Sequence, residues 1–450
     1  MAQYISYNSH THESHNIKKM VCLASPLINF QRKNHERGHE QSNTCLRKYV
    51  SAARQYRVLL TSFDLPGYRL HQVSMRTYSN GNMPVSSIDA DEQTRVMGIA
   101  MNGGDGPHSY AENSAYQRGY FEAAKEVLKE EIVAKLDVKQ TSSAFRITDL
   151  GCSTGPNTYL AAETIVEAVE QRFKSQGLHS PTPEIEVLFN DTTLNDFNTL
   201  LRCLPPERRY YATAAPGSFY SRLFPKASIH IVYSACTICW LSRIPKEVTD
   251  ETSPAWNKGS IHYDNGARKK VFEAYEAQFA KDMEVFLQKR AEEIVNGGLM
   301  ALLVAAAPDI MSDSVTTLAT EFQVLGSCLV DMAKQGIISE EKVDTFNLPL
   351  YYTRPKELKE LILRNGSFSI ERMEILNNKK EHVTMPNVER RTLFLRACFE
   401  GLFGQHFGYN IVDELFDRYA KKVVVSSFYL KPENQKTLML FVLLKRNDDK

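Results

Sequence analysis

Short apolar runs alternate with longer amphipathic stretches in the middle of the chain, and this alternation constrains the fold more than any other feature. The runs have the length of buried strands, and the stretches repeat apolar residues at three- and four-residue steps, as helices do. The predicted strands are 145–150, 184–189, 228–234 and 299–305, and the predicted helices are 116–136, 158–173, 195–203 and 267–295. This order favours an α/β fold, a parallel sheet with helices on both faces.

Two later stretches depart from this alternation. Residues 315–335 and 388–420 have helical periodicity but fit no strand–helix unit. We expect them to form an α-helical cap over the open end of the sheet. The cap segments are expected to occupy about 309–365 and 385–430.

The ends of the chain bound this domain. Two apolar runs near the C-terminus, 367–376 and 437–445, are predicted as strands at one edge of the sheet. We expect the domain to occupy residues 96–450. Residues 1–95 form a basic N-terminal extension, in which 1–82 hold eleven Lys or Arg against four Asp or Glu. A basic, serine-containing, acid-poor segment is typical of an organelle transit peptide. A disordered tail, or upstream sequence outside the functional protein, remains the alternative.

The composition excludes several classes of protein. The chain has 54 basic and 53 acidic residues, a net charge of +1, so it lacks the clustered positive charge on which nucleic-acid binding depends. No apolar run reaches the roughly 20 residues that cross a bilayer. The chain has eight cysteines and no secretory apolar segment near its start. We therefore expect a cytoplasmic protein with reduced thiols and with neither a nucleic-acid nor a membrane partner.

The strongest local signal lies between the first predicted strand and the next helix. It reads Asp149-Leu-Gly-Cys-Ser-Thr-Gly-Pro-Asn157, and its two glycines let a ligand approach the backbone at the usual cofactor position of such a sheet. It is neither the Gly-x-Gly-x-x-Gly turn of dinucleotide enzymes, which disfavours an NAD-dependent oxidoreductase, nor a phosphate-binding loop. S-adenosylmethionine has no phosphate and suits this turn. A tight turn without a ligand is the alternative.

A second acidic residue, Asp191, lies at the tip of the next predicted strand. A carboxylate there can accept hydrogen bonds from both ribose hydroxyls of an adenosine. By itself, an aspartate at a strand end is more often a helix cap. Its pairing with the glycine turn favours the cofactor site.

A series of motifs along the chain resembles those of the plant SABATH methyltransferases. They run in the order and spacing of that family from about 101 to 447, so residues 1–95 lie outside the resemblance. The family methylates the carboxyl groups of small acids such as salicylate, jasmonate or loganate, and some members methylate xanthine nitrogens. The motifs are Gly103-Gly-Asp-Gly-Pro-His-Ser-Tyr110, Asn113-Ser114-x-x-Gln117, Asp149 to Asn157, Asn190-Asp191, Asn195-Asp-Phe-Asn198, Pro216-Gly-Ser-Phe-Tyr220, Trp240-Leu-Ser242, Trp256-Asn-Lys-Gly259 and Asp344-Thr-Phe-Asn-Leu-Pro349.

The resemblance implies a Rossmann-like methyltransferase sheet, a helical cap over the active site and a homodimer. It implies S-adenosylmethionine as the cofactor and the methyl ester of a small-molecule carboxylic acid as the product. Gln117 and Trp240 would bind the substrate carboxylate and carry the reaction. Asp191 would hold the ribose, and Thr192 stands where leucine is common. The residues expected to contact the cofactor are Tyr110, Cys152, Asn157, Asp191, Thr192, Ser218 and Phe219.

Some members of the family hold Mg²⁺ near the site, and its ligands would here be Asn257, Asp344, the carbonyl of Phe346 and Asn347. These are hard oxygen ligands, which suits Mg²⁺. Each residue is also compatible with a turn or a helix cap. An occupied metal site and a structural cluster therefore both remain open.

The chain departs from the family pattern just before Trp240. The family usually has an aromatic residue at the position of Cys236 and His or Met at that of Cys239. Two small thiols predict a roomier substrate pocket, which favours an acid bulkier or more flexible than benzoate. A redox or zinc-binding role for this pair is disfavoured, because the pair leads out of a predicted strand and no second pair has zinc-finger spacing. The alternatives to a carboxyl methyltransferase are an N-methyltransferase that acts on a xanthine-like base and a catalytically silent homologue that only binds the cofactor.

Overall fold

The computed structural model describes residues 99–138, 144–176, 183–263, 268–309, 317–376, 387–426 and 438–448. All of these belong to one compact unit, Pro84–Lys450. The extension 1–95, with its transit-like segment, lies outside the described residues. Within the described part, no helix is both long and apolar enough to cross a membrane.

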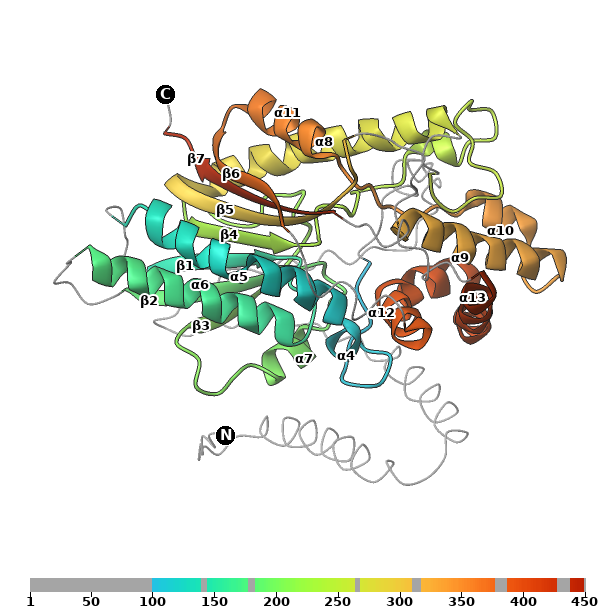
Figure 1. The fold of residues 1–450 in the computed structure, drawn as a ribbon, viewed down its shortest axis with the longest axis horizontal. Coiled ribbons are helices and arrows are strands. Elements are labelled where there is room, and N and C mark those ends of the chain that lie inside the picture. Colours follow the sequence, from blue (N-terminus) through green and yellow to red (C-terminus); the bar gives the residue numbers. More distant parts are fainter. Residues whose placement is uncertain are drawn as a thin grey trace, which may run out of the picture. The chain divides into compact units, whose positions relative to one another are not determined.

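A seven-stranded sheet forms the centre of the described fold (Figure 1). Its order is β3-β2-β1-β4-β5-β7-β6; the first five strands are parallel, and β7 is antiparallel to both of its neighbours. The carboxyl ends of the parallel strands therefore meet at one edge of the sheet. The strands are β1 (Ala144–Leu150), β2 (Glu184–Asp191), β3 (Tyr211–Pro216), β4 (Ile229–Ala235), β5 (Ile294–Ala306), β6 (Phe368–Leu376) and β7 (Leu438–Arg446).

Helices cover both faces of this sheet (Figure 1). The helices α5 (Ala115–Lys135) and α6 (Pro156–Ser175) bury their apolar side chains against one face. The helices α8 (Lys269–Glu293) and α11 (Pro355–Asn365) do the same on the other face. The predicted α/β fold is confirmed.

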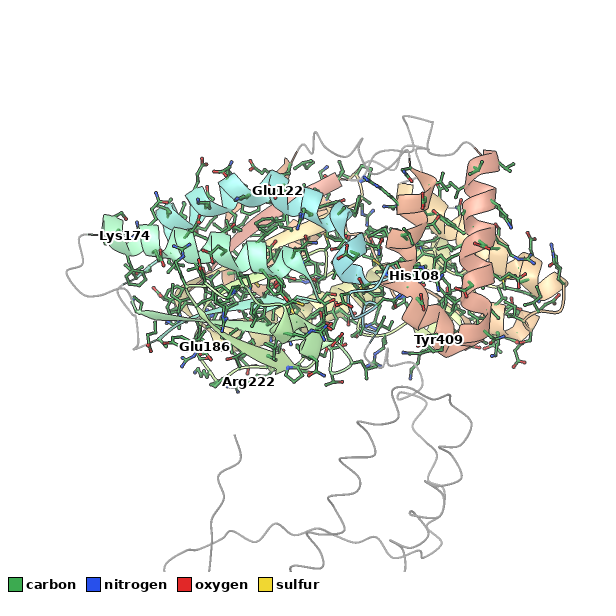
Figure 2. The ribbon with its side chains drawn as sticks, turned by 90° about the horizontal axis from the view of Figure 1, so that it is seen from below. His108, Glu122, Lys174, Glu186, Arg222 and Tyr409 are labelled. Atoms are coloured by element: carbon green, nitrogen blue, oxygen red, sulfur yellow. The ribbon has the colours of Figure 1, made fainter. Side chains whose placement is uncertain are left out.

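The start and end of α6 follow from its sequence. It begins at Pro156, whose missing N–H suits the first helical position, directly after Gly155 at φ 105°. Arg172 and Lys174 lie in its last turn, where positive charge faces the negative end of the helix dipole. Lys174, like Glu122 on α5, points away from the sheet (Figure 2). Charged outer faces and apolar inner faces thus fix these helices on the sheet.

A separate group of helices lies beyond the carboxyl edge of the strands, beside the sheet (Figure 1). Their buried side chains form a core of their own, to which α5 also contributes Tyr116 and Tyr120. The helix α11, within the first expected cap segment, packs on α8 instead. The helices of the cap are α9 (Thr317–Lys334), α10 (Glu340–Thr345), α12 (Val388–Phe407), the 3₁₀ turn η4 (Tyr409–Ile411) and α13 (Val412–Ser426).

Some observed elements differ from the predicted ones. The sequence did not predict β3, and the helical stretch expected over 388–420 consists of two helices, α12 and α13. The break falls at Gly408, whose φ of 104° ends α12 in a conformation that suits glycine. Two short helices, α4 (Tyr110–Asn113) and α7 (Phe197–Arg202), complete the fold around the site.

Candidate functional site

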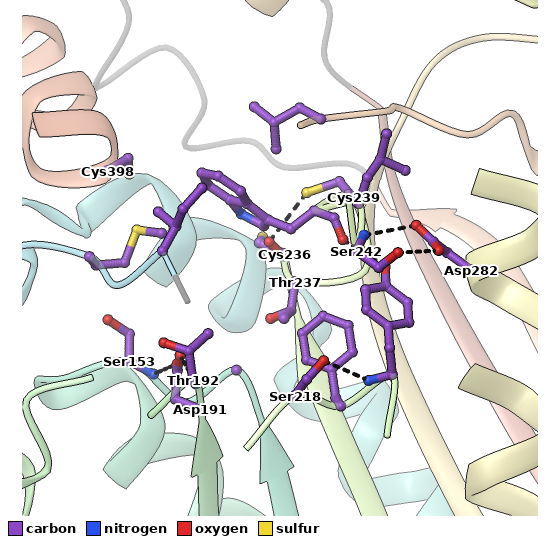
Figure 3. Close-up of a pocket in the computed structure, with 18 of the residues that line it drawn as sticks. Ser153, Asp191, Thr192, Ser218, Cys236, Thr237, Cys239, Ser242, Asp282 and Cys398 are labelled. Atoms are coloured by element: carbon purple, nitrogen blue, oxygen red, sulfur yellow. Dashed lines mark hydrogen bonds between the residues drawn. The ribbon is translucent and has the colours of Figure 1, made fainter. Parts of the chain in front are cut away.

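A cavity of about 860 Å³ lies at the edge where the parallel strands end (Figure 3). The strands β1, β2, β4 and β5 reach it with their carboxyl ends or the residues just after them, and α5 and the cap helix α12 close it. Two predicted residues, Cys152 and Asn157, are not part of its lining. Those that line it are Tyr110, Gln117, Asp191, Thr192, Ser218, Phe219, Cys236, Cys239 and Trp240.

The glycine turn after β1 forms one wall of the cavity. Gly151 and Gly155 have positive φ angles of 78° and 105°. A Cβ at Gly151 would overlap the side chain of Thr237, and a Cβ at Gly155 would lie 2.7 Å from the Cα of Ala111. Both glycines are therefore required by packing as well as by their backbone conformation.

Asp191 ends β2 and presents its carboxylate to the cavity (Figure 3). Each of its oxygens accepts one backbone N–H, from Ser153 and from Thr192, both at 2.7 Å. Burial raises the pKa of this carboxyl to about 6, against the opposing effect of the two N–H donors. An oxygen that accepts one hydrogen bond retains a lone pair, so the carboxylate can still accept two hydroxyls.

Asp149 is the last residue but one of β1 and has different surroundings. Its carboxylate accepts the hydroxyl of Thr158 at 2.5 Å, and burial raises its pKa to about 7. The residue does not line the cavity, whereas Gly151 does. Asp149 thus supports the glycine turn through its bond to α6 and without facing the cavity.

Cys152 and Asn157 belong to the same turn sequence but do not line the cavity. Cys152 is 7% exposed. The Asn157 amide donates to the carbonyl and hydroxyl of Ser114 at 3.1 and 2.9 Å, and its oxygen accepts from Arg118 at 3.3 Å. These bonds tie the start of α6 to the start of α5.

Trp240 lies in the loop after β4, and its backbone is held from three sides. Its N–H donates to Thr237, its carbonyl accepts the hydroxyl of Tyr220 at 2.6 Å, and it pairs with Leu350 as an isolated bridge. Its indole ring lies 5.6 Å from that of Phe399 on α12. The ring is therefore fixed between the sheet and the cap.

The rest of this half of the cavity is largely aromatic. Tyr116 on α5 and Phe394 on α12 are in ring contact at 5.3 Å, and Tyr352 lines the same space. Gln117 lines it one residue beyond Tyr116. An apolar space with an amide and an indole N–H suits a mostly apolar ligand that carries one polar group.

Three thiols line this space: Cys236, Cys239 and Cys398. Burial raises the pKa of Cys239 and of Cys398 to about 12, so both are neutral thiols. Cys236 has a positive φ of 57°, and its N–H donates to Leu303 at 2.8 Å. Among the described residues, no group of His, Cys, Asp and Glu is arranged to hold a metal.

The sequence did not single out the side chains that the cap contributes. Phe394 lies one helical turn before Cys398 and Phe399 on α12, and all three reach the cavity from a part of the chain far from the glycine turn. The helical period of 388–420 was the available signal. It identified a helix face but could not say that this face covers a ligand.

Three of the four predicted Mg²⁺ ligands, Asn257, Asp344 and Asn347, accept hydrogen bonds from N–H groups of the protein. Asn257 Oδ1 accepts from the guanidinium of Arg268 at 2.9 Å, and Asn347 Oδ1 accepts from the Asn257 amide at 2.7 Å. Asp344 accepts the N–H of Gly259 at 2.9 Å. Oxygens that point at N–H donors, one of them cationic, do not fit a Mg²⁺ ion.

The strand order, the antiparallel β7, the glycine turn after β1 and the acidic end of β2 define an α/β methyltransferase with a cofactor cavity at the strand ends. The chain belongs to the family of S-adenosylmethionine-dependent carboxyl methyltransferases, whose model matches residues 97–447. S-adenosylmethionine is accordingly its cofactor, and its reaction is the formation of a methyl ester from a carboxylic acid.

Comparisons with individual proteins agree with this family. The chain is 42% identical to loganic acid O-methyltransferase of Catharanthus roseus over 373 residues, 80% of this chain and 99% of the relative. It is 38% identical to farnesoic acid carboxyl-O-methyltransferase of Arabidopsis thaliana, over 72% of this chain and 92% of the relative. The solved structure of a loganic acid methyltransferase with S-adenosylhomocysteine (SAH) matches with a TM-score of 0.74 and 43% identity, over 78% of this chain and 99% of that one.

Proposed function

We propose that the chain methylates a carboxylic acid that is mostly apolar and bulkier or more flexible than benzoate. The observation that carries this proposal is that the carboxylate of Asp191 and the neutral donors Gln117 and Trp240 line one cavity. The aromatic walls and small thiols around the neutral donors favour an apolar body of some size. The relatives named for loganic and farnesoic acid support this size class.

We further propose how the cofactor is held. Asp191 accepts the ribose hydroxyls, while Ser218, Phe219, Thr192 and Tyr110 line the remaining cofactor space. Cys152 and Asn157 act indirectly, by holding the turn and the helix start behind it. Their replacement should therefore affect stability more than contact with the cofactor.

Bound S-adenosylmethionine supplies a methyl group activated by a sulfonium. A carboxylic acid is already ionised at pH 7, so the chain needs no general base. Gln117 and Trp240 each donate one hydrogen bond, which fixes the carboxylate without a full positive charge. The cap excludes water from the reacting groups. Holding the carboxylate in line with the methyl group can lower the activation free energy by on the order of 7–11 kcal/mol.

The test is incubation of the purified chain with labelled S-adenosylmethionine and a panel of salicylic, jasmonic, loganic and farnesoic acids and xanthine. Methyl ester from the larger acids is expected. Methylation of xanthine alone would support an N-methyltransferase instead. SAH binding without any product would indicate a silent homologue.

Two variants test the proposed substrate contacts. Gln117→Ala and Trp240→Ala should each reduce ester formation at least tenfold, because a hydrogen bond to a charged group is worth about 1.5–3 kcal/mol. Binding of SAH, measured by calorimetry, should change far less. Loss of SAH binding in both variants would contradict these roles.

The cluster around Asn257 is proposed to be structural. Its asparagine pair is fully buried, and Arg268 supplies the positive charge that a metal would bring. Addition of Mg²⁺ or of EDTA should then leave the melting temperature and the rate of methyl transfer unchanged. Asn257→Ala should lower the melting temperature both with Mg²⁺ and with EDTA. A clear rise with Mg²⁺ would restore the metal site.

We also propose a homodimer in the cytoplasm, on the basis of the family resemblance and the sequence. Light scattering coupled to size-exclusion chromatography measures the oligomeric state. Fluorescent fusions with and without residues 1–95 show the location in the cell. Organelle import that depends on 1–95 would support a transit peptide instead.

A further inference from the structure

Tyr352 reaches the cavity from the short segment that follows the bridge between Leu350 and Trp240. The Tyr351 N–H donates to the Cys239 carbonyl at 2.8 Å, so this segment is held beside the loop after β4. Its side chains alternate, as they do on a strand. Leu350 and Tyr352 line the cavity, whereas Tyr351 between them is fully buried in the core shared with α8 and α11.

The Tyr352 hydroxyl has no partner within the protein and is open to the cavity. The backbone N–H of Tyr352 donates to the Tyr263 hydroxyl at 3.0 Å, but its own hydroxyl forms no hydrogen bond to any described residue. Some polar atoms of the cavity wall are buried without a partner, as at Ser153, but the Tyr352 hydroxyl is not one of them and keeps accessible surface. Burial raises the pKa of this phenol well above its usual value, and nearby Cys239 and Tyr116, which also line the cavity, raise it further. The hydroxyl is therefore a neutral donor.

The other tyrosines of the described lining are engaged elsewhere. The hydroxyls of Tyr116 and Tyr120 are bonded to each other at 2.7 Å, and the Tyr220 hydroxyl donates to a backbone carbonyl at 2.6 Å. Tyr110 belongs to the space proposed for the cofactor. Among the tyrosines of this lining, Tyr352 thus has the hydroxyl that is available to an acceptor molecule.

We propose that Tyr352 is a specificity-determining residue: its hydroxyl donates a hydrogen bond to a neutral oxygen, a ketone or a hydroxyl, that the acid carries away from its carboxyl group. This inference rests on the proposed function and narrows its substrate class. A hydrocarbon acid that filled the same space would leave the hydroxyl buried without a partner, which is unfavourable. A site that bonds a polar group of its substrate rejects the analogue without that group more strongly than an apolar pocket rejects by size.

Binding without methyl transfer tests this preference. The full chain is saturated with SAH and titrated calorimetrically with two pairs of acids that differ in one oxygen. The first pair is jasmonic acid and its analogue with a methylene group in place of the ring ketone. The second pair is farnesoic acid and its derivative with a terminal hydroxyl. In at least one pair the oxygenated acid should bind about two- to tenfold more tightly, the range of one ordinary hydrogen bond.

Tyr352→Phe removes the hydroxyl and keeps the ring. It should abolish the preference by weakening the oxygenated acid alone, with SAH affinity unchanged. Tyr116→Phe is the matched control, because its hydroxyl is already bonded to that of Tyr120, and this variant should keep the preference. A preference that survives Tyr352→Phe would overturn the inference. An equal loss for both acids of a pair would also overturn it, because Tyr352 would then bind the carboxylate.

Failure of the proposed function gives a different result. A wild type that binds SAH but none of the four acids would refute the proposed acid substrate itself. Equal affinities within both pairs would overturn only the role of Tyr352.

Discussion

Neutral donors line one part of the cavity, and the buried carboxylate of Asp191 lines another. The part of the cavity that we propose for the acceptor is lined by an amide, an indole and three thiols whose pKa values are raised by burial, whereas the part that we propose for the cofactor is lined by the carboxylate of Asp191. A negative charge near the cofactor suits ribose hydroxyls and a sulfonium. The absence of any charge from these groups on the acceptor side lets an anionic substrate approach without being neutralised.

Lowering the pH through about 6 is expected to weaken the binding of SAH. Burial raises the pKa of Asp191 from 3.8 to about 6, so the proposed acceptor of ribose hydroxyls becomes protonated in this range. The contribution of Asp191 to the free energy of unfolding changes in the opposite sense: it decreases as the pH rises from about 4 to 6, because the unfolded chain has already lost that proton. Calorimetric titrations between about pH 5 and 8 measure the affinity.

Asp191→Asn is the control for that titration. It should bind SAH at least tenfold more weakly near pH 8 and should lack the loss near pH 6. Burial, and to a lesser extent the charge of Asp191, raise the pKa of Asp149 to about 7, so the pKa of Asp149 should fall in this variant, and Asp149 is the first group to which any remaining loss would be assigned. A variant that keeps the loss near pH 6 would show that another group is responsible.

Cys239→Met is expected to shift the preference toward smaller acids. Cys239 lines the acceptor half and is 7% exposed, so a longer side chain there fills cavity space. A misfit of about one methylene in an apolar pocket changes discrimination about 10- to 200-fold. The ratio of kcat/KM for farnesoic and salicylic acids measures it.

Cys328→Met adds the same bulk to a buried thiol outside the cavity lining. It should lower stability without changing that ratio. Equal changes in the two variants would mean that overpacking, and not the shape of the pocket, is responsible.

At the scale of single residues, the sequence predicted the site residues that follow strands, and it missed those that come from the cap helices. Asp191 and Gly151 are recognisable because a strand end and a turn have local patterns. Cys398 has no such pattern: only the packing of α12 against α5 makes it a neighbour of Gln117. Single-residue patterns cannot encode that packing.

The cap helices are joined by a buried ion pair, Glu321 on α9 and Arg391 on α12, with side chains 0% and 1% exposed. The guanidinium also lies over the ring of Tyr116, which lines the cavity. Glu321→Leu should therefore lower the free energy of unfolding by about 3–5 kcal/mol, because it leaves a buried charge without its partner. Chemical denaturation monitored by fluorescence measures this.

Asp331→Asn provides a matched control on the same helix. Asp331 pairs with Lys422, but these side chains are 44% and 35% exposed. Its loss should cost at most about 1 kcal/mol. Similar losses in the two variants would argue against the buried pair as the main link between α9 and α12.

Most elements were predictable because their apolar periods are strong, and the exceptions have physical reasons. The strand β3 reads Tyr-Ala-Thr-Ala-Ala-Pro, lies at the sheet edge and has no fully buried side chain, so it shows no apolar run. The break at Gly408 was hidden by apolar residues on both sides, which continue the helical period. Sheet order, and above all the place of β7 between β5 and β6, depends on long-range pairing that no local pattern reports.

On the scale of the described unit, three apolar cores meet around one cavity. Two lie on the faces of the sheet, and the third belongs to the cap. The lining runs from Ile99 to Phe399, so the site exists only when the sheet and the cap are assembled together. SAH binding should therefore be lost together with the tertiary structure in a single cooperative transition.

Removal of residues 1–95 is expected to leave SAH affinity and ester formation unchanged. The family model begins at residue 97, and the cavity lining begins at Ile99. A shortened chain that begins at Gly103 is the matched comparison, because it also loses Ile99, Met101 and the bond from the Asn102 N–H to the Ala397 carbonyl at 2.9 Å. This second chain should bind SAH more weakly and melt at a lower temperature, since the segment before α4 fastens the cavity to α12. Calorimetry and thermal melting of both chains beside the full chain decide the matter: weakened binding in the 96–450 chain would give the N-terminal extension a role in the site.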